Sequence, residues 1–197
     1  MTEKPHHHGN LRAALIAAGL ALLAEQGLEG LTLRRAAARA GVSHAAPAHH
    51  FKGKHGLIVA IAAEGFRTFT RTMAEDRIAA GTNAEAQLLG ICTGYLRFAT
   101  QHPALFRLIF TPTIKNDPDP ELQEASEAAF MVLSEVCALF EPSPHGEGAN
   151  ELMIWSLVHG YASLRAVEQM QNPKSGEPVP FASLLPPMRV KGEAVPS

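Results

Sequence analysis

The sequence has few cysteines, no long apolar run and almost no net charge. Its two cysteines, Cys92 and Cys137, stand far apart in apolar helical stretches, which indicates reduced core thiols in a cytosolic protein. No uncharged apolar run reaches about 18 residues, and no basic segment followed by an apolar one opens the chain, so we expect neither a membrane span nor a secretory signal. With 46% hydrophobic residues among 197, the chain can bury a substantial core.

The net charge of −2 argues against a nucleic-acid partner only until the charges are placed along the chain. Residues 1–54 carry seven basic and three acidic side chains, a net charge of +4, whereas the remainder carries ten basic and sixteen acidic ones, a net charge of −6. Six of the ten histidines also lie in residues 1–54. This distribution predicts an anion-binding N-terminal module on a body with another role; a merely solvated basic face is the alternative.

Helical patterns run through almost the whole chain, so the predicted fold class is all-α. Asn10 is expected to cap a helix that continues to Gly27. Thr32 is expected to cap a short helix that stops at Gly41, and Ser43 is expected to cap a second short helix. Proline-rich breaks at 111–120, 141–148 and 172–180 separate later helices, and a frayed tail starts at residue 186. These later helices are expected at 54–81, 84–101, 103–110, 120–140 and 148–171, with a weaker one near 181–185.

The two short helices joined at Gly41 have the spacing of a helix-turn-helix. Small side chains such as Ala45 can contact a thymine methyl group in the major groove, and hydroxyls at helix N-termini can bind phosphate. Packing without a DNA role is the alternative, because helix-glycine-helix segments also occur in bundles. The predicted DNA contacts are Thr32, Arg34, Ser43, His44, Ala45, His49, His50 and Lys54.

The segment LTLRRAAARAGVSHAAPAHHFKGKHGLI, residues 31–58, resembles the helix-turn-helix of the TetR/AcrR family of one-component transcriptional regulators. HHGNLRAALI at 7–16 and HPALFRLIF at 102–110 are similar to segments of one subgroup of that family. WSLVHGYASL resembles the Trp-His-Gly signature of the same subgroup, carried by Trp155, His159 and Gly160. One departure is Ala48, which stands where the family usually has a tyrosine that touches phosphate.

The resemblance implies an N-terminal three-helix DNA-binding domain at residues 1–54 and a C-terminal helical bundle for ligand binding and dimerisation at 55–189, with a disordered tail at 190–197. It implies a cytoplasmic homodimer that binds double-stranded operator DNA with palindromic symmetry and is released by a small-molecule effector. The helix around 148–171 and the one near Phe181 would pair with their dimer mates. Repression is the expected outcome, with activation as the alternative; neither a membrane nor a cofactor is expected.

Trp155 and His159 lie four residues apart, hence on one helix face, and are candidates for lining an effector cavity. Ordinary core packing is the alternative for both residues. Arg97 or Arg107 could pair with an anionic ligand. The full set of predicted effector-binding residues is Cys92, Tyr95, Phe98, Phe106, Phe110, Trp155 and His159.

Catalysis finds little support, because the sequence has no glycine-rich phosphate loop, serine nucleophile elbow or His-Glu metal helix. We therefore expect a protein that is not an enzyme. The competing hypothesis is a helical-bundle metal protein or enzyme that uses His102, Cys137 or His159. The histidines at positions 6–8 are expected in a DNA-proximal arm, with simple disorder or a metal site as the alternatives.

Overall fold

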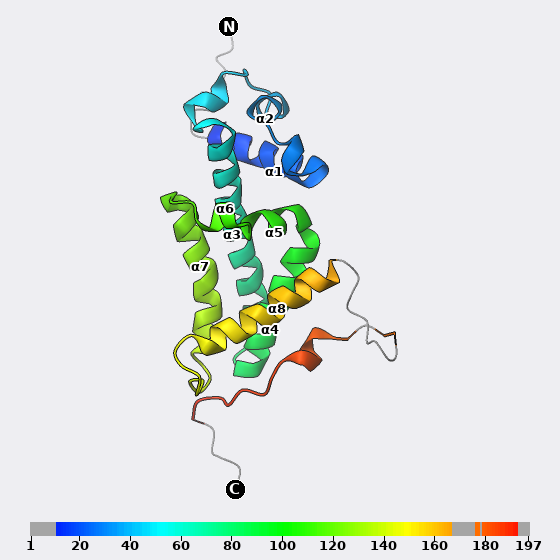
Figure 1. Ribbon diagram of the computed structural model, residues 1–197, viewed down its shortest axis with the longest axis vertical. Helices are drawn as coiled ribbons and strands as arrows, with labels where there is room; N and C mark the ends of the chain where they lie inside the picture. Colours follow the sequence, from blue (N-terminus) through cyan, green and yellow to red (C-terminus); the bar gives the residue numbers. More distant parts are fainter. Residues whose placement is uncertain (1–10, 167–175, 178, 193–197) are drawn as a thin grey trace. The chain divides into compact units, whose positions relative to one another are not determined.

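The computed structural model describes residues 11–166, 176–177 and 179–192, and these residues are helical apart from turns and one isolated bridge, as the sequence predicts (Figure 1). The longer helices are α1 (Leu11–Gly30), α3 (Gly53–Ala79), α4 (Ala84–Gln101), α7 (Pro120–Cys137) and α8 (Ala149–Arg165). The shorter helices are α2 (Leu33–Arg39), α5 (Pro103–Ile109) and α6 (Pro112–Lys115), and the 3-10 turns are η1 (Ala46–His49) and η2 (Phe181–Leu184).

The described residues form two compact units that each contain two stretches of the chain. Unit 1 comprises the residues up to Arg67 together with His102–Ser126, and unit 2 comprises Thr68–Gln101 and the residues from Glu127 onward. Two continuous helices, α3 and α7, begin in unit 1 and end in unit 2. This division by compactness is distinct from the domain boundary at residue 54, which stays a prediction.

Unit 1 is built around α1, which contacts α2 and α5. The side chains of Leu15, Leu31, Leu57 and Ile61 are fully buried. A Cβ at Gly19 would lie 2.5 Å from Ile61 Cδ1, so glycine is what allows these segments to pack closely. By length and composition α1 could also cross a membrane, but its large apolar side chains form this core.

A shared carboxylate links three helices of unit 1. Glu121, in the first turn of α7, accepts hydrogen bonds from Arg12 of α1 at 2.5 Å and from Arg67 of α3 at 2.6 Å. Burial raises the pKa of Glu121, but the two guanidinium groups more than offset this, so its pKa lies below the ordinary value. Arg12 also lies 5.9 Å from the ring centroid of Phe51, and Arg67 has a second carboxylate partner in Glu64 at 3.3 Å.

In unit 2, α4 packs closely against the end of α3, and α8 lies across α4 (Figure 1). A Cβ at Gly94 would lie 2.6 Å from the carbonyl oxygen of Thr72, a distance that permits glycine alone. Both cysteines are free and buried, as the sequence predicts. Burial raises the pKa of the Cys92 and Cys137 thiols to about 12, so both stay protonated at neutral pH.

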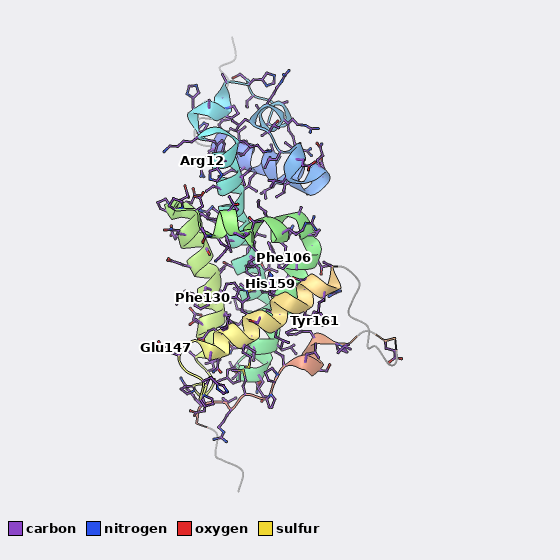
Figure 2. The ribbon with its side chains drawn as sticks, in the orientation of Figure 1. Arg12, Phe106, Phe130, Glu147, His159 and Tyr161 are labelled. Carbon is purple, nitrogen blue, oxygen red and sulfur yellow. The ribbon has the colours of Figure 1, made fainter. Side chains whose placement is uncertain are left out.

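The described residues 179–192 are held at two points, in contrast to the fraying predicted from residue 186; the disorder expected at 190–197 stays a prediction. Tyr161 donates a hydrogen bond to Val179 O at 2.8 Å, and its ring packs on that of Phe181 (Figure 2). Farther on, Val190 forms an antiparallel bridge with Phe140. Backbone hydrogen bonds to residues 139 and 141 order residues 189–191; residues 193–197 lie outside the described part.

Most helix boundaries lie within two residues of the predicted ones, and outside the segment 40–52 three larger differences occur. The α4 range is reproduced in full, whereas α1 continues to Gly30 through a kink at Gly27, where φ is 67°. The proline-rich break at 111–120 contains α6, which opens with Pro112, a residue suited to a first helical turn. Helix α7 ends at Cys137 instead of residue 140, and the part of the expected last helix at 167–171 lies outside the described residues.

Candidate nucleic-acid interface and aromatic cluster

The first half of the candidate DNA reader is α2 with its turn. Thr32 caps the helix as predicted, because its Oγ1 accepts a hydrogen bond from Arg35 N at 3.2 Å. The chain then reverses at Gly41, whose φ of 69° favours glycine, and Val42 N donates to Ala37 O at 3.0 Å. Thr32 is half-buried, and its hydroxyl oxygen accepts the hydrogen bond that caps α2.

The second half differs from the predicted helix. Instead of a helix capped by Ser43, the structure has the four-residue turn η1, whose N-cap is Ala45 without a side-chain hydrogen bond. Pro47 explains the difference: it has no amide proton to donate, and its ring is buried within unit 1. Ser43 contributes its carbonyl, which accepts from Ala46 N at 3.1 Å, and its side chain stays exposed.

Small and imidazole side chains form the exposed surface of this element. His44, Ala45 and His49 are exposed, as are Ser43 and Ala48. His50 is half-buried, with its ring centroid 6.3 Å from that of Phe51. The predicted base-contacting residues His44, Ala45 and His49 therefore lie on one short, accessible stretch of chain.

Basic residues precede and follow this stretch in the sequence, and they differ in their hydrogen-bond partners. Arg34 and Lys52 are exposed and form no hydrogen bond or ion pair with another described residue. Lys54 donates to Leu28 O at 3.3 Å, an exposed contact, and Arg35 donates to Gly30 O at 3.3 Å. Lys52 was not among the predicted DNA contacts; its position between η1 and α3 makes it a further candidate.

A second candidate site lies in unit 2, where Tyr95 of α4 meets Trp155 and His159 of α8. The Tyr95 hydroxyl lies 2.7 Å from His159 Nδ1 and is also hydrogen-bonded by Trp155. Because an indole N–H can only donate, the Tyr95 hydroxyl is the acceptor in its hydrogen bond with Trp155. Burial lowers the pKa of His159 and raises that of Tyr95, so both are neutral at neutral pH.

The predicted effector-binding residues fall into both units. Phe98 and Tyr95 pack around Phe69, with ring centroids 5.0 and 4.8 Å from it, and Cys92 is buried on the same helix. Phe106 and Phe110 belong to unit 1, where their rings lie 5.1 Å apart. Unit 2 thus contains five of the seven residues, those on α4 and α8: Cys92, Tyr95, Phe98, Trp155 and His159.

The residues of the metal-protein hypothesis are divided in the same way. His102 belongs to unit 1, whereas Cys137 and His159 belong to unit 2. Among the described residues, no three histidine, cysteine, aspartate or glutamate side chains gather as a metal site; the histidines at 6–8 lie outside that part. Arg97, a candidate for an anionic ligand, is held by Asp76 at 2.8 Å and Glu75 at 3.2 Å.

The neutral state of His159 has a consequence for stability. Below about pH 6.5, the ordinary pKa of histidine, the unfolded chain binds more protons than the folded chain, so unit 2 loses stability as the pH falls. His159→Gln keeps a hydrogen-bonding side chain and removes this titration, so its stability should fall less between about pH 7.5 and about pH 5. Urea unfolding followed by Trp155 fluorescence measures both; parallel losses in the two proteins would contradict the assignment.

Two family profiles match the chain in the order of its domains. Residues 15–61 match the family described as "Bacterial regulatory proteins, tetR family". Residues 88–182 match "Tetracyclin repressor-like, C-terminal domain". The second match includes Trp155 and His159 but names no Trp-His-Gly subgroup, which stays a prediction. No curated protein sequence matches the chain.

Solved structures share the fold over most of the chain. A protein of unknown function from Rhodococcus sp. RHA1 is 30% identical, with a TM-score of 0.72 over 92% of this chain and 93% of its own. A TetR family transcription regulator from Marinobacter aquaeolei VT8 is 16% identical, with a TM-score of 0.56 over 83% and 87% of the two chains. The transcriptional regulator SCO7222, a TetR from Streptomyces coelicolor, is 21% identical, with a TM-score of 0.59 over 80% and 71%.

Proposed function

The chain belongs to the TetR family of bacterial transcription regulators, with an N-terminal helix-turn-helix DNA-binding domain; on that premise we propose that it is a ligand-responsive repressor that binds a palindromic operator as a homodimer. It acts in the cytoplasm, with DNA as its partner and no catalytic step of its own. The observation that carries the DNA-binding role is the set of exposed residues Ser43, His44, Ala45, Ala48 and His49 after α2, a helix that carries the unpaired cation Arg34, with the unpaired Lys52 following them in the chain.

Homodimerisation is supported by an apolar patch on unit 2. Phe130 and Met131 of α7 are 43% and 52% exposed, and Leu152 of α8 is 65% exposed. The rings of Phe130 and Trp155 lie 6.2 Å apart, and Leu152 lies one turn before Trp155 on the same face of α8. Exposed apolar surface of this kind favours a partner, and a second copy of the same patch fits a two-fold axis.

This patch revises the expected interface. The expected interface consisted of α8 and the segment near Phe181. However, Phe181 is only 7% exposed and packs on Tyr161 of its own chain. Helix α7 instead supplies the second exposed apolar face. We therefore assign the four-helix interface to α7 and α8 of the two subunits.

The effector is proposed to bind beside Tyr95 and His159, where neutral donors and acceptors lie among aromatic rings. Phe69, which packs on Tyr95, lies on α3, the helix that starts directly after the DNA reader. A ligand that alters this packing would shift α3 and move the two readers out of register with successive major grooves. Such a ligand must bind the two dimer conformations with different affinity.

The test of the proposed function is selection of bound sequences from a random DNA pool with the full-length protein. A palindrome with two half-sites about one helical turn apart is expected, because two identical readers share one axis. In transcription in vitro, the protein should reduce synthesis from a promoter that contains this palindrome. Increased synthesis would make it an activator, and failure to enrich any sequence would overturn the assignment of an operator-binding regulator.

Lys54 provides a prediction about phosphate contact. Lys54→Ala should weaken binding to all DNA sequences and reduce the slope of log K against log salt by about one unit, because one phosphate contact is lost. Lys191→Ala is a matched control, since Lys191 is also exposed but lies in the C-terminal segment of unit 2. Fluorescence anisotropy at several salt concentrations measures both slopes. Changed preference among sequences with an unchanged slope would show that Lys54 contacts bases instead.

A further inference from the structure

We propose that the DNA-reading surface is sensitive to protons: His44 and His49 become protonated on contact with DNA, and affinity for DNA therefore rises as the pH falls below neutrality. This inference rests on the proposed function, because it concerns the regulation of the same surface. It identifies pH as a second input to the regulator, separate from any small molecule that binds unit 2.

The first observation is the composition of the reading segment. Between Arg39 and Lys52 the chain contains no lysine, arginine, aspartate or glutamate, and its ionisable side chains are three histidines. Histidine is the side chain whose charge ordinarily changes between about pH 5 and 8. The positive charge that this segment can offer to DNA therefore depends on pH.

The second observation is the accessibility of two of these imidazoles. His44 and His49 are exposed, and neither forms a hydrogen bond or ion pair with another described residue. Their neighbours Ala45 and Ala48 are exposed and small, so both rings can reach a DNA surface. His50 differs, because it is half-buried beside Phe51.

The surrounding charges leave the histidines as the groups that change with pH. Helix α2 packs against η1, and α3 begins directly after it. At the start of α3, His55 is engaged by Asp117, with Nε2 and Oδ2 2.6 Å apart. Arginine and lysine stay protonated throughout the range in which histidine titrates. The other charged groups on these elements are Arg34, Arg35, Lys52, Lys54 and Arg39, which is paired with Glu25 of α1.

DNA favours the protonated imidazole for two reasons. A protonated ring donates from both nitrogens, so it can bind a phosphate oxygen or the N7 and O6 acceptors of guanine. Each phosphate that it neutralises also releases counterions and steepens the salt dependence by about 0.9 units.

The experiment measures DNA affinity by fluorescence anisotropy at about pH 8 and about pH 6, with a selected palindrome and an unrelated duplex as probes. The full-length protein should bind both DNAs at least about tenfold more tightly at the lower pH, with a steeper salt slope. The double variant His44→Gln, His49→Gln keeps hydrogen-bonding side chains without the charge, and its affinity should change with pH several-fold less than that of the unaltered protein. His49→Lys should bind tightly at both values. His145→Gln removes an exposed histidine of unit 2 and should respond as the unaltered protein does.

Two outcomes would overturn the inference: an affinity of the unaltered protein that does not change with pH, or a pH response of the double variant that is as large as that of the unaltered protein. In either case DNA binding itself would remain, so the proposed function would stand. A folded protein that binds neither duplex at any pH would instead overturn the proposed function. Circular dichroism of each variant at both pH values verifies that the proteins compared are folded.

Discussion

Replacing Leu152 by glutamate is expected to convert the dimer into monomers and to weaken binding to a palindromic operator by at least about a hundredfold. Leu152 is 65% exposed on α8, within the patch formed with Phe130 and Trp155. On a two-fold interface the substitution buries two carboxylates, one from each subunit, without partners. Two linked readers gain about 10²- to 10⁴-fold over one through their effective concentration, and a monomer loses this gain.

Sedimentation and DNA binding of the same preparation measure the two effects. Ile78→Glu is the matched control, because Ile78 is 78% exposed on α3 and the substitution adds the same charge. This variant should remain dimeric and bind the palindrome with unchanged affinity. A dimeric Leu152→Glu protein, or equal dissociation of the two variants, would show that subunits meet through another surface.

Gly94→Ala is expected to lower the free energy of unfolding of unit 2 by about 2–3 kcal/mol. The added methyl group would lie 2.6 Å from Thr72 O and 2.7 Å from Met73 Cα, both backbone atoms of α3. Since backbone cannot rotate away as a flexible side chain can, the two helices must separate. Alanine has the higher helix propensity, by about 1 kcal/mol, so this loss would appear against the intrinsic preference.

Trp155 is the single tryptophan of the chain and lies in unit 2, so its fluorescence during urea unfolding reports on this unit. Gly160→Ala is a suitable control, because Gly160 lies on α8 in the same unit. No heavy atom outside the local helix backbone lies within 4 Å of its new methyl group. The control should be neutral or slightly stabilising, and equal effects of the two substitutions would contradict close packing at Gly94.

Local signals account for the helices that the sequence predicted well. Helix α4 has the expected range because Asn83 Oδ1 accepts a hydrogen bond from Ala86 N at 2.8 Å, and Gly81 before it has a φ of 80°. Thr32 caps α2 for the same kind of reason. Each of these boundaries depends on residues that are neighbours in the sequence, so a pattern of caps and glycines suffices to predict it.

Contacts between distant residues account for what was missed. The bridge between Phe140 and Val190 joins segments that are fifty residues apart, and nothing in the composition of either segment predicts their pairing. A second short helix was expected after Ser43, but the ring of Pro47 is buried in the core of unit 1 and the helix is reduced to η1. Burial of a ring depends on the whole unit and not on local propensity.

The candidate sites show the same division. Spacing along one helix predicted that Trp155 and His159 share a face, and both meet Tyr95. Spacing could not reveal that Phe106 and Phe110 pack in the other unit, because an apolar aromatic pattern is the same in either core. The roles of these residues in binding DNA or effector stay predictions.

Glu121 forms ion pairs with both Arg12 and Arg67, so substitutions at these three positions are expected to have unequal effects. If Glu121 is kept, Arg67 still has Glu64 and Arg12 still has the ring of Phe51, so either arginine can be replaced while the other keeps its partner. Loss of Glu121 instead removes one ion pair from each arginine at once. Because these side chains are 35–41% exposed, each pair contributes little by itself. Descendants of this sequence can therefore lose either arginine at a smaller cost than the glutamate.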